Sequence, residues 1–321
     1  MSHKKDTDYL SISARIRAME TRLLTRERLE RMVDARDNAE ALKVLAECGY
    51  GELNAADPAG LEHSLSAARE ALFAELSAAV PDGGMLDIFR LKYDYHNAKV
   101  LLKAAATGQD AARLLLSGGR YDPKHPELWG DFFRKAVERA HTCLEETKDP
   151  QQADLLLDKA CFEEMGLLAK ECGSDFLQGY VRLAIDAANL RSRVRCARLE
   201  KGADFLKQVL MEGGNVGVDT LLRAREVGEP FRVGPLAEAA QIADALAKPD
   251  SGALTAFERE CDNALMAYQD KARRTPFGEE VVAGYLFARE SELTAIRTVM
   301  AGRMAGLSGD VIRQRLRKSY I

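Results

Sequence analysis

Two aspartates in this sequence stand in the same setting and are the side chains best placed for chemistry. Each lies four residues after an arginine and three before an asparagine, in the sets Arg90, Asp94 and Asn97, and Arg182, Asp186 and Asn189. A carboxylate among apolar neighbours can acquire a shifted pKa and act as a general acid or base. On a helix, however, the arginine and the asparagine lie within one turn of the aspartate and can hold it ionised. Because the whole set is repeated, we predict a structural clamp rather than a catalytic group.

A weaker third copy of the pattern lies nearer the C-terminus. It contains Glu292, Ala295, Ile296 and Arg297, with Arg289 in place of the i−4 arginine. All three copies end in an apolar residue followed by a basic one. The aspartates are 92 residues apart (186 minus 94), and the glutamate follows 106 residues later (292 minus 186). Copies about a hundred residues apart are too widely spaced for a short solenoid and predict three related helical modules.

The first copy lies in residues 89–104, which contain no helix breaker and are predicted to form one helix. Its apolar side chains cover most of the helical circumference, so the helix should be buried on most sides. Opposite them runs one narrow basic stripe, made of Lys92, His96, Lys99 and Lys103. The stripe is a candidate partner interface. His96 could relay a proton, but a solvent-facing place in the stripe is the favoured interpretation.

Helical periodicity continues along the whole chain, and no segment alternates with the period of two expected of a strand. Ala, Leu, Arg and Glu abound while Val, Ile and Thr are sparse, so we predict an all-α fold. Connections rich in Gly and Pro divide the chain into three helical modules of one compact unit, at 1–121, 122–229 and 230–321. We expect one long helix from residue 9 to about 36 and a last one over 309–319.

Composition restricts the class of protein. The chain has 321 residues, 46% hydrophobic and 30% charged, which is typical of a packed globular fold. Its net charge of −4 disfavours nucleic acid as the main partner. The sequence has no apolar run long enough to span a bilayer and no signal peptide, so we expect the protein in the cytoplasm. The six scattered cysteines should be reduced thiols.

Familiar catalytic and cofactor motifs are missing from the sequence. It has no Gly-x-x-x-x-Gly-Lys-Ser/Thr phosphate loop, no Gly-x-Ser-x-Gly and no His-Glu-x-x-His. The glycines at 213, 214 and 217 follow a helix, so they are interpreted as turn residues. We therefore assign no catalytic residue, metal ligand or cofactor.

The C-terminal residues form a second basic feature. Arg313, Arg315, Arg317 and Lys318 alternate with apolar residues in the last predicted helix. Such a segment could meet anionic lipid or an acidic partner. A solvated helix end, favoured by the helix dipole, explains it equally well.

Four segments resemble one known family, the C subunits of V-type and A-type ATPases and ATP synthases, which are the prokaryotic counterparts of the vacuolar d subunit of eukaryotes. The strongest is Leu91-Lys-Tyr-Asp-Tyr-His-Asn-Ala-Lys-Val-Leu-Leu-Lys-Ala104. The others are Tyr9-Leu-Ser-Ile-Ser-Ala-Arg-Ile-Arg-Ala-Met-Glu20, Ile185-Asp-Ala-Ala-Asn-Leu-Arg191 and Glu290-Ser-Glu-Leu-Thr-Ala-Ile-Arg297. They occur in order over nearly the full chain. The chain departs from the pattern in the third module, where Ala295 replaces the asparagine.

The resemblance implies a non-catalytic part of a rotary motor. Members of this family form a funnel with pseudo-threefold symmetry from three helical modules. The broad face sits on the cytoplasmic end of the membrane proteolipid ring, and a socket receives the D and F subunits of the central shaft. Such a protein transmits torque between ATP chemistry and ion transport, as a peripheral part of the complex. We therefore expect a polar, charged socket and a more apolar base.

Two interpretations from other classes remain open at this point. One is an all-α hydrolase or lyase that uses a buried Asp94 or Asp186. The other is a soluble scaffold unrelated to membranes. Neighbouring genes for a proteolipid, for catalytic A and B subunits and for the shaft would favour the rotor interpretation over both.

Overall fold

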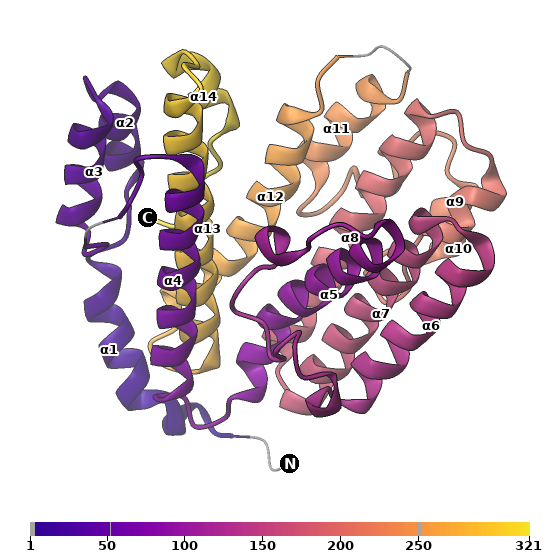
Figure 1. Cartoon of the computed structure of the whole chain (residues 1–321), viewed down its shortest axis with the longest axis horizontal. Helices are drawn as coiled ribbons and strands as arrows, with labels where there is room; N and C mark the ends of the chain where they lie inside the picture. The colour runs from indigo at the N-terminus through magenta and orange to yellow at the C-terminus, as the bar shows by residue number, and fades with distance from the viewer. Residues whose placement is uncertain (1–3, 52, 249–251) are drawn as a thin grey trace.

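The computed structural model describes residues 4–51, 53–248 and 252–321, and this part of the chain is all-helical. Fourteen α-helices and five short 3₁₀ helices follow one another, and no strand occurs in the described ranges (Figure 1). The predicted all-α fold is confirmed. No helix within these ranges is both long and apolar enough to cross a membrane. No disulfide joins any of the six cysteines, all of which lie in the described ranges.

The α-helices divide the chain into segments of very different length. In chain order they are α1 (Leu10–Glu20), α2 (Arg26–Asp34), α3 (Asn38–Glu47), α4 (Pro58–Ser77), α5 (Gly84–Thr107), α6 (Asp131–Thr147), α7 (Pro150–Cys172), α8 (Asp175–Arg198), α9 (Ala203–Val209), α10 (Val218–Arg223), α11 (Ala237–Leu246), α12 (Thr255–Gln269), α13 (Glu279–Met304) and α14 (Gly309–Arg315). The 3₁₀ helices are Asp6–Tyr9, Ala112–Leu114, Pro126–Leu128, Glu229–Phe231 and Asp270–Arg274.

Side-chain caps explain where many of these helices begin. Asp37, Asp57, Asp149 and Ser174 each accept a hydrogen bond from a backbone N–H in the first turn of α3, α4, α7 and α8. Such caps satisfy backbone donors that have no partner inside the helix. Proline at the first position of α4 and α7 adds to the signal, because its missing N–H costs nothing there.

The prediction of a single helix from residue 9 to about 36 is wrong. The chain forms α1 and α2 instead, separated by a turn after Glu20. The Thr25 side chain caps α2 by accepting a hydrogen bond from the Arg28 N–H. Leu23 and Leu24 lie in the turn and are almost fully buried. Burial of these two leucines favours a bend that helical periodicity does not reveal.

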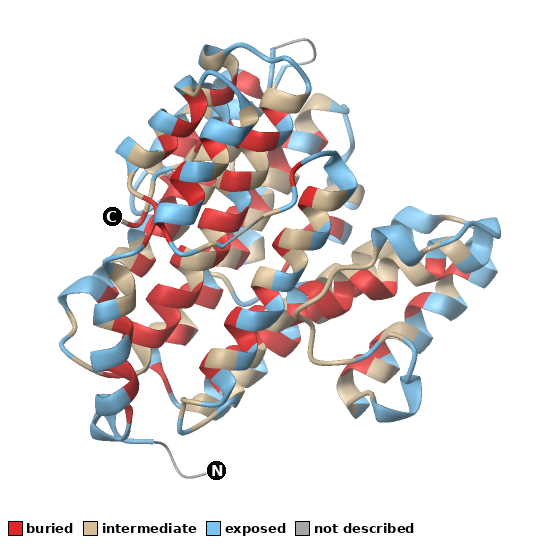
Figure 2. Cartoon of the chain, turned by 60° about the vertical axis from the view of Figure 1, so that its left-hand side comes forward, coloured by how far each residue is buried: buried red, intermediate tan, exposed pale blue. Residues whose placement is uncertain are grey.

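Three helices form the centre of the molecule: α5, α8 and α13, which carry the three copies of the sequence pattern and are called the clamp helices below. Their N-terminal halves meet in the largest hydrophobic core. There the Tyr180 ring of α8 stacks on Phe89 of α5 at 5.3 Å between centroids, and it meets Phe287 of α13 edge-on at 5.9 Å. Buried residues are accordingly concentrated along the central helices in Figure 2.

Each clamp helix packs against a helix that belongs to another part of the chain. Helix α7 lies along α5, and α12 lies along α8. Helix α4 precedes α5 in sequence, yet it packs along α13 near the other end of the chain (Figure 1). A separate core joins these terminal segments, with Met32, Leu65 and Met300 fully buried in it. The N- and C-terminal parts are thereby fastened to each other.

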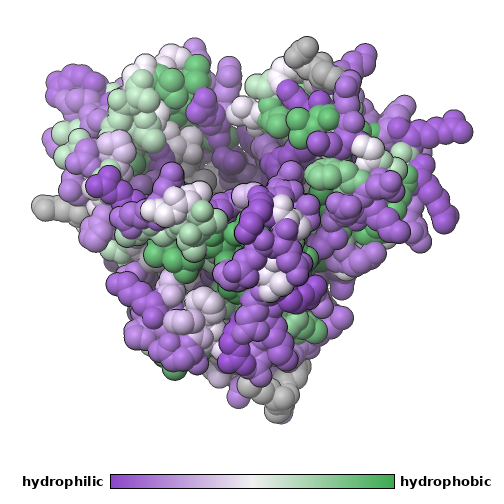
Figure 3. Space-filling view, turned by 45° about the vertical axis from the view of Figure 1, so that its right-hand side comes forward, coloured by the Kyte–Doolittle hydropathy of each residue, from purple (hydrophilic) through white to green (hydrophobic). Residues whose placement is uncertain are grey.

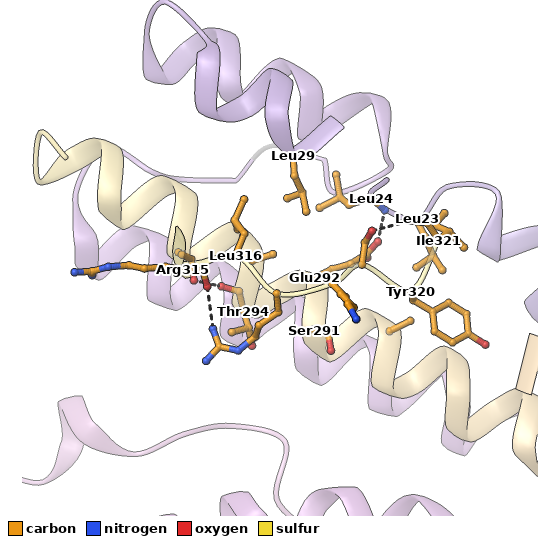
Figure 4. A pocket seen from close by; sticks show the side chains of 16 residues that line it. Leu23, Leu24, Leu29, Ser291, Glu292, Thr294, Arg315, Leu316, Tyr320 and Ile321 are labelled. Carbon is orange, nitrogen blue, oxygen red and sulfur yellow. Dashed lines mark hydrogen bonds between the residues drawn. The ribbon is translucent and has the colours of Figure 1, made fainter. Parts of the chain in front are cut away.

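The last helix is shorter than expected, because α14 ends at Arg315 rather than near residue 319. Residues 316–321 leave the helix and run back over α13 (Figure 4). Leu316 and Tyr320 are buried on this path. The Tyr320 carbonyl accepts a hydrogen bond from Arg273. Burial of these two side chains favours an extended tail over a continued helix.

Candidate functional site

Asp94 of α5 binds a loop outside its own helix. The residue is only 2% exposed, and its Oδ1 accepts hydrogen bonds from the backbone N–H groups of Arg120 (2.9 Å) and Tyr121 (3.1 Å). The predicted pairing with Arg90 inside the helix is wrong. Arg90 turns to α4, where it donates to the Ser77 hydroxyl at 3.2 Å and its guanidinium lies over the Phe73 ring. The buried carboxylate therefore takes its hydrogen bonds from the main chain.

Asn97, one turn further along α5, fastens the same loop at a second point. Its side-chain NH₂ donates to the Leu116 carbonyl at 2.9 Å, and its Oδ1 accepts the Leu116 N–H at 2.8 Å. Asn189 of α8 makes the same pair of bonds with the backbone of Met211, both at 2.8 Å. An asparagine amide that bonds both the N–H and the C=O of one residue satisfies that residue's backbone as a neighbouring β-strand would.

Asp186 completes the correspondence between α5 and α8. Its carboxylate accepts the backbone N–H groups of Asn215 and Val216, both at 3.2 Å, and the Asn215 side-chain NH₂ at 2.8 Å. Burial raises the pKa of Asp186, against these hydrogen bonds and the nearby Arg182 guanidinium, which lower it. We call residues 116–121 and 211–216 the anchored loops.

Paired glycines allow the anchored loops to approach the carboxylates. A Cβ atom on Gly119 would lie 2.3 Å from Oδ1 of Asp94, and one on Gly214 would lie 2.3 Å from Oδ1 of Asp186. The preceding glycines, Gly118 and Gly213, have φ of +95° and +94°, in the region that glycine adopts without strain. The glycines at 213 and 214 are turn residues, as expected, but their position is set by the aspartate.

The third clamp helix uses a different segment of the chain. Glu292 of α13 accepts the Leu24 N–H, the Tyr50 hydroxyl at 2.6 Å and the Arg289 guanidinium at 2.9 Å (Figure 4 shows Glu292 beside Leu24). Leu24 and Tyr50 come from the N-terminal part of the chain. Ala295 has no amide, so this copy lacks the second attachment. In this copy the carboxylate binds segments from the N-terminal part of the chain, whereas in the other two copies it binds the loop that follows the helix.

The basic residue that ends each copy of the pattern has an equivalent role in all three. It lies five residues after the carboxylate and forms ion pairs with the helix packed alongside. Lys99 pairs with Asp158 of α7, and Arg191 pairs with Glu258 (2.5 Å) and Asp262 (2.6 Å) of α12. Arg297 forms a two-point ion pair with Glu62 of α4, at 2.6 and 2.7 Å. The pattern therefore encodes helix pairing as well as loop attachment.

The four side chains of the basic stripe on α5 have different surroundings. Lys99 and Lys103 face α7, where Lys103 pairs with Asp154 at 2.6 Å. His96 Nε2 lies 3.0 Å from the Leu114 carbonyl. Lys92 points to the middle of the molecule and pairs with Glu290 of α13 at 2.6 Å. Three of the four side chains thus hold neighbouring helices, and a partner contact by this stripe stays a prediction.

A hollow of about 390 Å³ lies where the clamp helices approach one another, and we call it the central pocket. Its walls come from α4, α5, α8, α12, α13 and the C-terminal tail. The charged residues lining it are Arg69, Lys92, Arg297, Arg317, Lys318, Asp262 and Glu290. The face drawn in Figure 3 is hollowed between its lobes, with hydrophilic residues around the depression. Of the charged residues lining the pocket, sequence reasoning singled out Lys92, Arg297, Arg317 and Lys318 but missed Arg69 and Glu290.

The groups at the base of the central pocket are already paired. Glu290 is buried and accepts hydrogen bonds from the Lys92 ammonium and the Tyr93 hydroxyl, both at 2.6 Å. Burial lowers the pKa of Lys92, but the Glu290 carboxylate together with the Tyr93 and Tyr180 side chains raises it, so the net shift is upward. Lys92 is therefore a fixed cation rather than a base or nucleophile. This arrangement is suited to binding charge, not to moving a proton.

The C-terminal cations differ in how far they are available to a partner. Arg313 forms ion pairs with Glu30, Asp34 and Asp310. Arg317 pairs with Asp262 of α12. Arg315 and Lys318 are exposed, and within the described parts of the chain neither forms an ion pair. Contact between these four cations and a partner stays a prediction.

The structure gives Asp94 little room for a substrate. The cavity beside it measures about 10 Å³, close to the space of a single water molecule. A larger hollow of about 540 Å³ lies between α7 and α8, where Arg182 and Lys159 line it with apolar neighbours. No group of three or more His, Cys, Asp or Glu side chains among residues 4–51, 53–248 and 252–321 is arranged to hold a metal ion.

Replacing the glycine at the second carboxylate tests the anchored loop. Gly214→Ala places a methyl group against the Asp186 carboxylate and should lower the free energy of unfolding by about 1–3 kcal/mol through overpacking. Gly217→Ala is the matched control, because nothing lies within 4 Å of its added Cβ and its φ is −67°. That change should stay within about 1 kcal/mol. Equal effects in urea denaturation would contradict the proposed close approach.

The protonation of Asp94 gives a pH-dependent prediction. Burial raises its pKa from 3.8 to about 7, against the backbone hydrogen bonds of Tyr121 and Arg120. Because the folded-state pKa exceeds the unfolded value, the stabilisation is present at low pH and is lost as the pH rises from about 4 to about 7, by at most about 1.4 kcal/mol per pH unit. Asp94→Asn keeps the accepting oxygen but cannot ionise.

The unfolding free energy of the wild type, minus that of Asp94→Asn, should therefore fall between pH 5 and pH 8. Urea denaturation of both proteins at each pH measures it. A difference that stays constant or rises with pH would show that Asp94 is ionised in the fold.

Comparisons with known proteins point to one family. The chain matches the ATP synthase (C/AC39) subunit family over residues 12–315. It is 23% identical to the C subunit of the V-type sodium ATPase of Enterococcus hirae, over 98% of this chain and 99% of the relative. It is 26% identical to the C subunit of the V-type ATP synthase of Thermus thermophilus, over 94% and 95%. For the C subunit of the A-type ATP synthase of Methanocaldococcus jannaschii the identity is 23%, over 96% and 86%.

The family match covers nearly all of the chain, from the first α-helix to the last. The three copies of the sequence pattern, with their attached loops and paired helices, all lie inside the matched residues. The chain therefore belongs to the ATP synthase (C/AC39) subunit family, the family of the C subunits of V-type and A-type ATP synthases.

Proposed function

We propose that this chain is the non-catalytic central-rotor component of a V-type ATPase or ATP synthase. In this role it couples the central shaft, made of the D and F subunits, to the proteolipid ring of the membrane sector. It transmits torque for ATP-driven ion transport or for ATP synthesis. The observation that carries the proposal is the family match along residues 12–315, combined with a charged pocket at the meeting point of the three clamp helices.

The proposed shape is a funnel with pseudo-threefold symmetry, built from modules 1–121, 122–229 and 230–321. Three equivalent attachments support it, because each clamp helix holds a segment through a buried carboxylate at Asp94, Asp186 or Glu292. Each clamp helix also pairs with a helix from the next module, and the third pairs with the first. Such a closed cycle suits a ring-shaped adaptor.

Torque transmission requires a body that does not deform under load. Dense helix packing has low compressibility. The buried carboxylates, the two-point asparagine bonds and the interhelical ion pairs add directional restraints between neighbouring elements. Within this rigid body we assign the central pocket to the shaft. We assign the broad face of the funnel to the ring, on the cytoplasmic side of the membrane.

The enzyme alternative gains no support from the two aspartates. Asp94 and Asp186 are 2% and 4% exposed, and both accept hydrogen bonds from the main chain. These contacts serve the fold, and the Asp94 cavity has no room for a substrate. A structural role accounts for both residues.

Isolation of the chain from native membranes tests the proposal. An affinity-tagged full-length chain should co-purify with the proteolipid ring, the catalytic A and B subunits and the D and F subunits of the shaft. Membranes that lack the chain should lose ATP-driven ion uptake, while the detached soluble sector still hydrolyses ATP. Adding purified chain back should restore uptake. Full ion uptake without the chain, or purification without ring and shaft, would contradict the proposal.

A further inference from the structure

The central pocket has more positive than negative charge. Five cationic and two carboxylate side chains line it, so it has a surplus of three positive charges, although the whole chain has a net charge of −4. Three of these cations have carboxylate partners: Lys92 pairs with Glu290, Arg317 with Asp262, and Arg297 with Glu62. The remaining two, Arg69 and Lys318, have no such partner in the described chain.

Arg69 is the more unusual of the two cations. The residue is only 4% exposed. Its guanidinium donates one weak hydrogen bond, to the Ser117 carbonyl at 3.4 Å, and lies 4.7 Å above the Tyr93 ring. A buried charge without a counter-ion is costly. The stacking on Tyr93 offsets part of that cost. A carboxylate that enters the pocket would provide the missing counter-ion.

Lys318 lies in the C-terminal tail and is exposed. Its backbone N–H donates to Asn263 Oδ1 at 2.8 Å, which fixes this part of the tail against α12. The side chain is therefore held at the pocket by its main chain, while its ammonium stays available. Substitution of the side chain leaves the anchoring bond in place.

Apolar and aromatic surface accompanies the charge. Tyr93, Tyr180, Leu265, Met266 and Phe287 line the same pocket. An occupant with carboxylates and an apolar side would match both the charge and the surface.

We propose that the central pocket binds an acidic, amphipathic segment of a protein partner, with its carboxylates directed to Arg69 and Lys318. This inference rests on the proposed function, and it specifies the chemistry of the shaft segment that the pocket receives. Charge complementarity of this kind speeds association and is weakened by salt.

The experiment measures the affinity of the full-length chain for the co-purified D and F shaft subunits at low and high salt. Between about 50 mM and about 400 mM NaCl the dissociation constant should rise roughly tenfold or more. At low salt, Lys318→Glu should weaken binding by roughly tenfold, and Lys318→Gln by roughly threefold. Both effects should shrink at high salt.

Lys43→Glu is the matched control, because it makes the same change of charge at an exposed lysine on α3. It should leave the affinity unchanged, and circular dichroism should show all variants folded. Shaft binding that is insensitive to salt and to Lys318→Glu, or equally sensitive to Lys43→Glu, would overturn this inference and leave the proposed function standing. If the wild type binds no shaft, the proposed function fails, and the inference fails with it.

Discussion

The structure depends on a carboxylate that is buried in each of three long helices and must find hydrogen-bond donors. Asp94 and Asp186 find them in backbone N–H groups of a loop that follows the helix, and Glu292 finds one in Leu24. Each carboxylate thereby fixes a segment that has no regular hydrogen bonding of its own. Glycine at 119 and 214 follows from the same constraint, because a side chain would collide with the carboxylate.

The ion pair five residues further along each helix extends this arrangement from loops to neighbouring helices. Lys99, Arg191 and Arg297 join α5 to α7, α8 to α12 and α13 to α4. The last pairing joins the two ends of the chain, so the set closes on itself. The central pocket lies inside this cycle, and its walls are therefore held by restraints from every part of the chain.

Sequence reasoning predicted the all-α fold and the three copies of the pattern, because helical periodicity and residue spacing are local signals. It did not predict the partners of the carboxylates. A spacing of four residues places Arg90 next to Asp94 on a helix, but the contacts with Phe73 and Ser77 that turn Arg90 away are tertiary. Glu292 and Leu24 are 268 residues apart, beyond any local signal. The extended tail after Arg315 likewise depends on burial of Leu316 and Tyr320 against distant helices.

Backbone hydrogen exchange tests the central claim most directly, because the claim concerns four named N–H groups. In the wild type the amides of Arg120, Tyr121, Asn215 and Val216 should exchange slowly, although they lie outside helices. Asp94→Ala should release the first two and leave the last two protected, and Asp186→Ala should do the reverse, so each variant controls the other. Unchanged protection of all four amides in both variants would contradict the account.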